Sequence, residues 1–150
     1  LWVMGDTPNA VAAYRHALSL NSYDYRANWE AARIILTQDP QEAYALANRS
    51  LELKPNVPDA LVVRGRALLA LKRPKEAVED LKRASLLDSE DDAIHFQLAR
   101  AYRQLGMPEE EKKENTVLLQ MRKSADEAMR KKVQGHLENQ FPQDGQAAPH

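Results

Sequence analysis

The sequence predicts an all-α protein in which antiparallel helix pairs stack into an array. A skeleton of about 34 residues recurs along the chain. One set of small residues recurs at Ala10, Ala43 and Ala77, and a second set follows in step with it at Ala17, Ser50 and Ala84. Between them, apolar residues recur every three to four positions, the spacing of one helix face. Proline, glycine and capping residues separate the segments, so each repeat is interpreted as two helices and two turns.

Capping and turn residues delimit the individual helices. Asp39 and Glu42 have the spacing of a reciprocal N-terminal cap, and Ser89 is a candidate cap for the last helix of the regular pattern. Gly106 followed by Pro108 is the stop and restart expected between two helices. Together with prolines suited to a first helical turn, these signals predict helices at about 8–20, 25–36, 40–53, 59–71, 75–87 and 91–105.

The regular pattern weakens from residue 109 onward. The small positions of the second helix become Glu111 and Leu118, and the usual bulky position becomes Asn115. These departures suit the end of an array, where one face meets no further repeat. Apolar residues nevertheless continue at helical spacing. We expect either one long helix or two nearly collinear helices, with the break at Ser124-x-x-Glu127.

A period of this length made of two helices resembles the tetratricopeptide repeat family. The matching residues are small ones in the first helix, small ones in the second helix and a proline after it: Ala31 and Gly65, then Ala10, Ala43 and Ala77, then Pro55. The resemblance implies a right-handed superhelical solenoid with a C-terminal capping helix, and a chain that is the C-terminal fragment of a longer repeat protein. The implied division is a partial repeat at 1–23, repeats at 24–57, 58–91 and 92–122, a helical extension at 123–139 and a disordered tail at 140–150.

The composition excludes several classes of function. The 21 basic and 22 acidic residues nearly balance, which argues against a general binder of nucleic acid or of anionic membranes. No apolar run is long enough for membrane insertion, and the absence of cysteine excludes disulfides and thiolate metal sites. The sequence contains no catalytic signature, and its four histidines are too dispersed to hold a metal. We therefore expect no cofactor, no metal and no nucleic acid, and a protein or peptide as the partner.

In this family the first helices line the concave side, and positions one repeat apart stack into columns. The columns expected here are Asn28, Val62 and Phe96, then Ala32, Arg66 and Arg100, then Ile35, Leu69 and Arg103. Apolar side chains beside arginine suit a peptide groove, because they anchor a partner while the planar guanidinium holds a carboxylate. The simpler alternative is that the arginines only solvate the surface or pair with acids of the same chain. The candidate groove residues are Asn28, Val62, Arg66, Leu69, Phe96, Arg100 and Arg103.

The leading hypothesis is a non-enzymatic protein-interaction scaffold that binds a partner protein or peptide in this groove. The family's clamp for chaperone C-termini is disfavoured, because only Asn28 matches its Lys, Asn and Arg positions, which here hold Asn28, Ala32, Val63, Ala93 and Gln97. The alternative, from a different class, is a regulatory or substrate-recruiting region of an enzyme whose catalytic domain lies upstream. A third hypothesis is structural self-assembly. Weak self-association is also expected through the apolar N-terminal edge, Leu1, Trp2 and Val3.

Overall fold

The computed structural model describes residues 7–140, and all regular secondary structure in this range is α-helical. The helices are α1 (Thr7–Leu20), α2 (Tyr25–Ile35), α3 (Pro40–Leu53), α4 (Pro58–Ala70), α5 (Pro74–Leu87), α6 (Asp92–Gln104) and α7 (Pro108–Gln140). Each helix predicted from the sequence is present, with ends that differ by one residue at most. The all-α prediction is confirmed.

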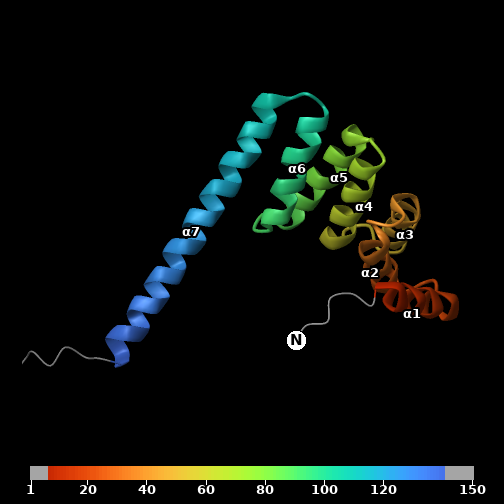
Figure 1. Ribbon diagram of the computed structural model, residues 1–150, viewed down its shortest axis with the longest axis horizontal. Coiled ribbons are helices and arrows are strands. Elements are labelled where there is room, and N and C mark those ends of the chain that lie inside the picture. The colour runs from red at the N-terminus through yellow and green to blue at the C-terminus, as the bar shows by residue number, and fades with distance from the viewer. Residues whose placement is uncertain (1–6, 141–150) are drawn as a thin grey trace, which may run out of the picture.

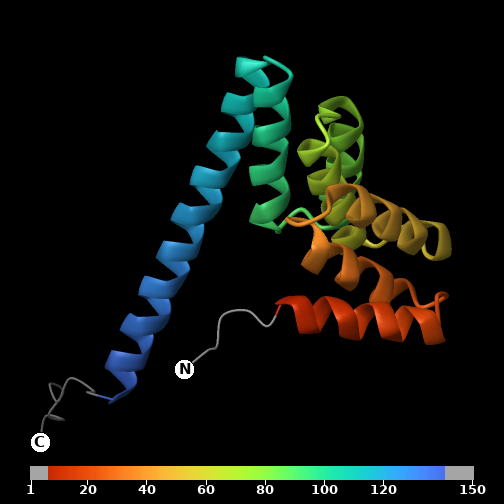
Figure 2. The ribbon, with the colours of Figure 1, turned by 45° about the vertical axis from the view of Figure 1, so that its right-hand side comes forward.

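Consecutive helices pack against one another and form a solenoid of helix pairs. Each helix from α1 to α6 contacts the next one in the chain, and the first helices of successive pairs, α2 with α4 and α4 with α6, are also in contact. Figures 1 and 2 show α1 to α6 as successive layers, with α7 lying beside α6 at one end and then extending away from the array. This stacked arrangement of pairs confirms the predicted architecture.

Small residues of one helix meet large residues of the next in the interior. Ala43, Ala77 and Ala84, which carried the repeat in the sequence, are each 0% exposed. Leu61 and Leu81 are also 0% exposed and belong to a core cluster that joins α3, α4, α5 and α6. The repeat therefore reflects close helix packing, in which the regular spacing of small side chains lets neighbouring helices approach.

Most helix starts carry the signals expected from the sequence. The side chain of Asp39 accepts a hydrogen bond from the Glu42 backbone N–H at 2.9 Å, so the predicted cap forms. The reciprocal half does not form, because the Glu42 carboxylate binds Arg15 instead, at 2.7 Å. At α6 the cap is Asp91 rather than Ser89, with the Asp91 side chain accepting from the Ala93 N–H at 2.9 Å.

One repeat is a residue shorter than the next, and this corrects the predicted register. The residues that precede the first helices are Asp24, Val57 and Asp91, and the interval from Asp24 to Val57 is one residue shorter than the interval from Val57 to Asp91. Helix α2 has 11 residues where α4 has 13, and the turn after α2 has one residue more than the turn after α4, so the net shortfall is one residue. Counted from these capping positions, the small residue that matches Gly65 is Ala32, not Ala31.

The C-terminal helix α7 is a single unbroken helix of 33 residues. Of the two alternatives left open by the sequence, the structure therefore has the first, with no helix break at Ser124-x-x-Glu127. None of the residues of α7 is buried. The expectations for residues 1–6 and for the tail at 141–150 lie outside the described range.

Overpacking the contact at Ala77 gives a direct test of the repeat geometry. We expect Ala77→Leu to lower the free energy of unfolding by about 1–3 kcal/mol, because the fully buried methyl leaves no room for a larger group. Urea titration followed by circular dichroism measures the change. The matched control is Ala13→Leu on the exposed side of α1, and equal stability of the two variants would contradict the packing.

Candidate functional site

The corrected register brings two columns of side chains onto the same face of the first helices. The fifth residue after each capping position is Trp29, Val62 or Phe96, and we call these three the apolar column. The ninth residue is arginine in all three helices, and we call Arg33, Arg66 and Arg100 the arginine column. Residues four apart lie on the same side of a helix, so the two columns run next to each other. Because α4 contacts both α2 and α6, each column is continuous across the three helices.

Arg66 stands between two other positive charges. Partial burial lowers the pKa of Arg66, and the charges of Arg100 and Arg33 lower it further. An arginine side chain stays protonated in proteins despite such a shift. The three guanidinium groups therefore concentrate positive charge on a protein whose formal net charge is −1.

The arginine column is short of acidic partners. Among residues 7–140, Arg33 and Arg66 form neither a hydrogen bond nor an ion pair, while Arg100 donates from Nη1 to the side-chain oxygen of Gln97 at 3.1 Å. On α2, Glu30 already accepts a hydrogen bond from the Tyr14 hydroxyl at 2.9 Å. The positive charge on this face is thus available to an anion from outside the described chain.

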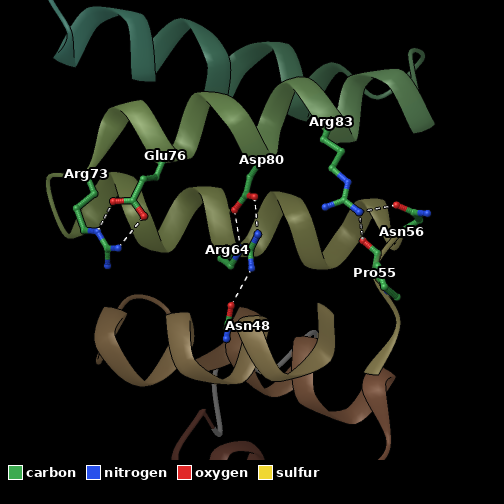
Figure 3. A network of polar contacts seen from close by, with 8 residues as sticks. All are labelled: Asn48, Pro55, Asn56, Arg64, Arg73, Glu76, Asp80 and Arg83. Atoms are coloured by element: carbon green, nitrogen blue, oxygen red, sulfur yellow. Dashed lines mark hydrogen bonds and ion pairs between the residues drawn. The ribbon is translucent and has the colours of Figure 1, made fainter. Parts of the chain in front are cut away.

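Other arginines of the chain are held by internal partners. Arg64 forms a bidentate pair with Asp80, at 2.6 and 2.7 Å, and Arg73 forms another with Glu76, at 2.7 and 2.8 Å (Figure 3). Arg83 donates to the backbone oxygen of Pro55 at 3.0 Å. Among the arginines predicted to line the groove, pairing with an acid of the same chain describes Arg103, which binds Glu111, and does not describe Arg66.

The apolar column changes from partly covered to open along the array. Trp29 and Val62 are half-buried against the core cluster. The Phe96 side chain is 53% exposed. An apolar ring this exposed beside uncompensated arginine is a surface on which a partner can bury area.

The structure buries two of the seven predicted groove residues, Asn28 and Leu69, and gives a third, Arg103, an internal partner. Asn28 is 1% exposed, and its amide donates to the backbone oxygens of Ser22 and Asp24 at 3.1 and 2.7 Å. Leu69 is likewise 1% exposed and lies in the core. Arg103 is exposed, but its guanidinium binds Glu111 at 2.5 and 2.8 Å and so joins α6 to α7.

Four of the predicted residues, Val62, Arg66, Phe96 and Arg100, lie in the two columns, and their role in binding stays a prediction. Sequence reasoning missed Trp29 and Arg33 because it assumed a constant repeat length. Counting back one such repeat from Val62 gives Asn28, and counting back from Arg66 gives Ala32. The signal was present in the sequence. Ala10 and Ala43 are one residue closer together than Ala43 and Ala77, which indicates that the repeat length is not constant.

Two further classes of site are absent from the described residues. No group of three or more His, Cys, Asp or Glu side chains in this range could hold a metal ion. None of the helices from α1 to α7 has both the length and the apolar character that a transmembrane helix needs.

Comparisons with known proteins agree with this architecture. Residues 58–91, which contain the α4–α5 pair, match the family model of the tetratricopeptide repeat. A comparison with curated protein sequences found no match.

Several solved structures have a similar fold. MamA from Desulfovibrio magneticus RS-1, residues 41 to the end, aligns with a TM-score of 0.75 and 18% identity over 82% of this chain and 70% of its own. Another crystal structure of MamA aligns with a TM-score of 0.68 and 16% identity over 97% of this chain and 90% of its own. The TPR2B domain of yeast Sti1, solved as a complex with pHsp70, aligns with a TM-score of 0.60 and 28% identity over 66% of this chain and 85% of its own.

The class of protein is thus a solenoid of antiparallel helix pairs with a charged and apolar face on its first helices. Residues 58–91 match one tetratricopeptide repeat, and the chain shares its fold with MamA and with the TPR2B domain of Sti1. This family is generally a non-catalytic protein-interaction module, and the fold accordingly supports a protein-interaction scaffold.

Proposed function

We propose that the chain binds a segment of another protein across the arginine and apolar columns. The segment carries an acidic residue next to a bulky apolar residue, because the two columns are one helical turn apart. The observation that carries this proposal is the position of Arg66, which is partly buried between Arg33 and Arg100 and has no acidic partner among residues 7–140.

The arrangement of charge favours a carboxylate over other groups. A guanidinium presents two parallel N–H donors that match both oxygens of a carboxylate, and such charge-assisted pairs are among the strongest hydrogen bonds in proteins. Partial burial reduces the screening of Arg66 by water. A bound carboxylate would also relieve the repulsion among the three arginines. Binding should therefore be sensitive to salt, with the association rate falling as ionic strength rises.

The apolar column supplies contact area that charge alone does not provide. Phe96 offers an exposed ring, and Trp29 and Val62 extend the strip toward the other end of the array. Aromatic and arginine side chains are the residue types that most often dominate binding energy at protein interfaces. A preformed solenoid can present both columns with little rearrangement. The Sti1 TPR2B domain, solved as a complex with pHsp70, supports this kind of use for the fold.

A fluorescein-labelled decapeptide of alternating aspartate and leucine tests the proposal by fluorescence anisotropy. We expect it to bind better than a lysine–leucine peptide of the same length and to lose affinity as salt increases. The triple variant Arg66→Ala, Phe96→Ala, Arg100→Ala should weaken binding by about 2–4 kcal/mol. Its melting temperature should stay near that of the unmodified chain, because none of these side chains is buried.

A matched control uses the outer side of α5. The triple variant Lys75→Ala, Lys82→Ala, Leu86→Ala also removes two cations and one exposed apolar side chain, and Leu86 is 88% exposed. It should bind the acidic peptide as well as the unmodified chain. Equal loss in both triple variants would show nonspecific attraction, and equal affinity for the acidic and basic peptides would overturn the proposal.

A further inference from the structure

The groove between α6 and α7 is another open surface of the described chain, and it shares Phe96 with the apolar column. Its volume is about 970 Å³, and its lining residues come from the start of α6 and the middle of α7. The apolar part of the lining consists of Ala93, Phe96, Val117, Leu118, Met121 and Ala125. Apolar lining on two adjacent helices is what a third helix needs in order to pack.

The far half of α7 has an apolar stripe with nothing packed on it. In the described range α7 contacts only α6. Helix α7 has 33 residues and α6 has 13, so α7 is longer than α6 by about 30 Å. Met129, Val133 and Leu137 on this projecting part are 63%, 51% and 51% exposed. They are four residues apart, so successive members lie on neighbouring positions of a stripe that winds by about 40° per step around the helix axis, starting from Met121 and Ala125.

A projecting helix with an exposed apolar stripe gains stability from tertiary contacts, because most helical stability in proteins comes from packing an apolar face. Residues 127–140 continue the part of α7 that lies beside α6, but their own apolar side chains are exposed. The groove can accommodate an apolar helix, and the stripe is an apolar helix face that packs on nothing in the described chain.

The charges of the two surfaces are also complementary. The groove is lined by three carboxylates, from Glu90, Asp92 and Asp126, against one arginine, Arg122. The stripe is flanked by Arg130, Lys131 and Lys132. Within residues 7–140, the side chains of these three basic residues and of the three acids form no ion pair. A helix carrying the stripe can therefore enter the groove with opposite charges facing each other.

We propose that two copies of the chain associate through α7, each placing its Met129–Val133–Leu137 stripe in the α6–α7 groove of the other. Figure 2 shows α7 extending beyond α6 as one straight helix. The stripe and the α7 side of the groove lie on successive parts of this same helix, so the stripe can reach a groove only on a second copy. An antiparallel pairing of the two α7 helices satisfies both grooves at once. This is the isologous contact of a two-fold dimer, in which the same surface serves both partners.

Sedimentation velocity of residues 1–150 between 1 and 200 μM, as order-of-magnitude limits for such an interface, tests the proposal. We expect the average mass to rise with concentration from one chain toward two. Met129→Glu with Val133→Glu should raise the dissociation constant at least about tenfold, because the stripe would carry two unpaired charges into the groove. Leu86→Glu, which places a charge on a more exposed apolar side chain of α5, should leave association unchanged.

Charge reversal distinguishes this specific interface from nonspecific association. Glu90→Lys with Asp92→Lys should weaken association, as should Arg130→Glu with Lys131→Glu and Lys132→Glu. Mixing the two variants should restore a heterodimer, because each groove then faces an oppositely charged stripe. Circular dichroism confirms that each variant remains helical. Failure of the mixture to associate, while both parents are folded, would overturn the proposal.

Deletion of residues 141–150 distinguishes a second copy from the chain's own tail as the occupant. The proposal expects the same dissociation constant with and without these residues. If the full chain stays a monomer at every concentration and only the shortened chain associates, the tail covers the groove and the proposal is wrong. If both forms stay monomeric, another protein is the partner of this surface and the proposal is also wrong.

Discussion

Asp80→Ala should lower the free energy of unfolding by roughly 2–4 kcal/mol. Asp80 is 7% exposed and accepts hydrogen bonds from Arg64 Nε and Nη2 at 2.7 and 2.6 Å. The Arg64 Nη1 atom donates to Asn48 Oδ1 at 2.8 Å, so one guanidinium connects α3, α4 and α5 (Figure 3). The hydrogen bonds to Asp80 raise the pKa of Arg64. Removal of Asp80 leaves a positive charge in the packed region between three helices.

The size of this effect follows from what remains after the substitution. Breaking a buried ion pair by removing one partner is costly because the other charge loses its compensation. Arg64 keeps 20% of its side-chain area in contact with solvent, which reduces the cost below that of a fully buried pair. Replacing both residues, by Arg64→Met with Asp80→Leu, should recover most of the lost stability, since a well-packed apolar pair leaves no charge behind.

A matched control lies one helical turn away. Glu76 forms a bidentate pair with Arg73 whose side chains are 50% and 40% exposed. Exposed pairs are screened by water and contribute little, so Glu76→Ala should cause a much smaller loss than Asp80→Ala. Guanidinium chloride titrations of the two single variants measure both changes. A loss for Asp80→Ala no larger than that for Glu76→Ala would show that the pair does not hold the three helices together.

The fold was predictable because small residues at a regular spacing mark the places where helices touch. Ala43, Ala77 and Ala84 are fully buried where helices meet, and a methyl group at each contact leaves little freedom for other arrangements. Caps and prolines then placed the helix ends, as at Asp39, where the side chain bonds a free backbone N–H at the helix start.

The candidate site was less predictable, since it depends on registers and partners that a constant period does not contain. The missing residue in the α2 repeat moved two columns by one position, and a shift of one residue on a helix turns a side chain by about 100°. Asn28 resembles a surface residue in the sequence, yet its amide satisfies two backbone oxygens at the turn before α2. Arg66 and Arg103 look alike in the sequence, and only the fold shows that Glu111 reaches Arg103.

The continuity of α7 illustrates the same limit. Ser124-x-x-Glu127 has the spacing of a cap, but both residues are also tolerated inside an exposed helix. A cap stabilises a helix start only where the chain turns, and packing decides where that happens. No following helix within the described range forces a turn near residue 124, so α7 continues to Gln140.

Leu81→Ala and Gly65→Ala should each destabilise the fold, and together should cost less than the sum of the two. Leu81 is 0% exposed, so truncation to alanine should cost about 2–5 kcal/mol through lost burial and the cavity left behind. A Cβ at residue 65 would lie 2.9 Å from Leu81 Cγ and 3.1 Å from its Cδ2. Glycine to alanine inside a helix normally gains up to about 1 kcal/mol, but this clash should reverse the sign and cost about 1–3 kcal/mol.

Gly135→Ala is the matched control for the backbone effect. Gly135 is also inside a helix, and a Cβ there would meet no atom within 4 Å. This substitution should therefore stabilise α7 by up to about 1 kcal/mol. If Gly65→Ala stabilised the protein as much as Gly135→Ala, the close approach of α4 and α5 would be wrong.

The double variant tests whether Gly65 and Leu81 act on the same space. In the Gly65→Ala background the clash disappears once Leu81 is shortened, and the new methyl fills part of the cavity. The cost of Leu81→Ala should then be smaller by about 0.5–3 kcal/mol than in the unmodified chain, which is the range measured for residues in direct contact. Four urea titrations with equal slopes complete the thermodynamic cycle. Additive losses would mean that α4 and α5 separate to accept the methyl, so that the glycine would be required for helix approach in general and not for contact with Leu81.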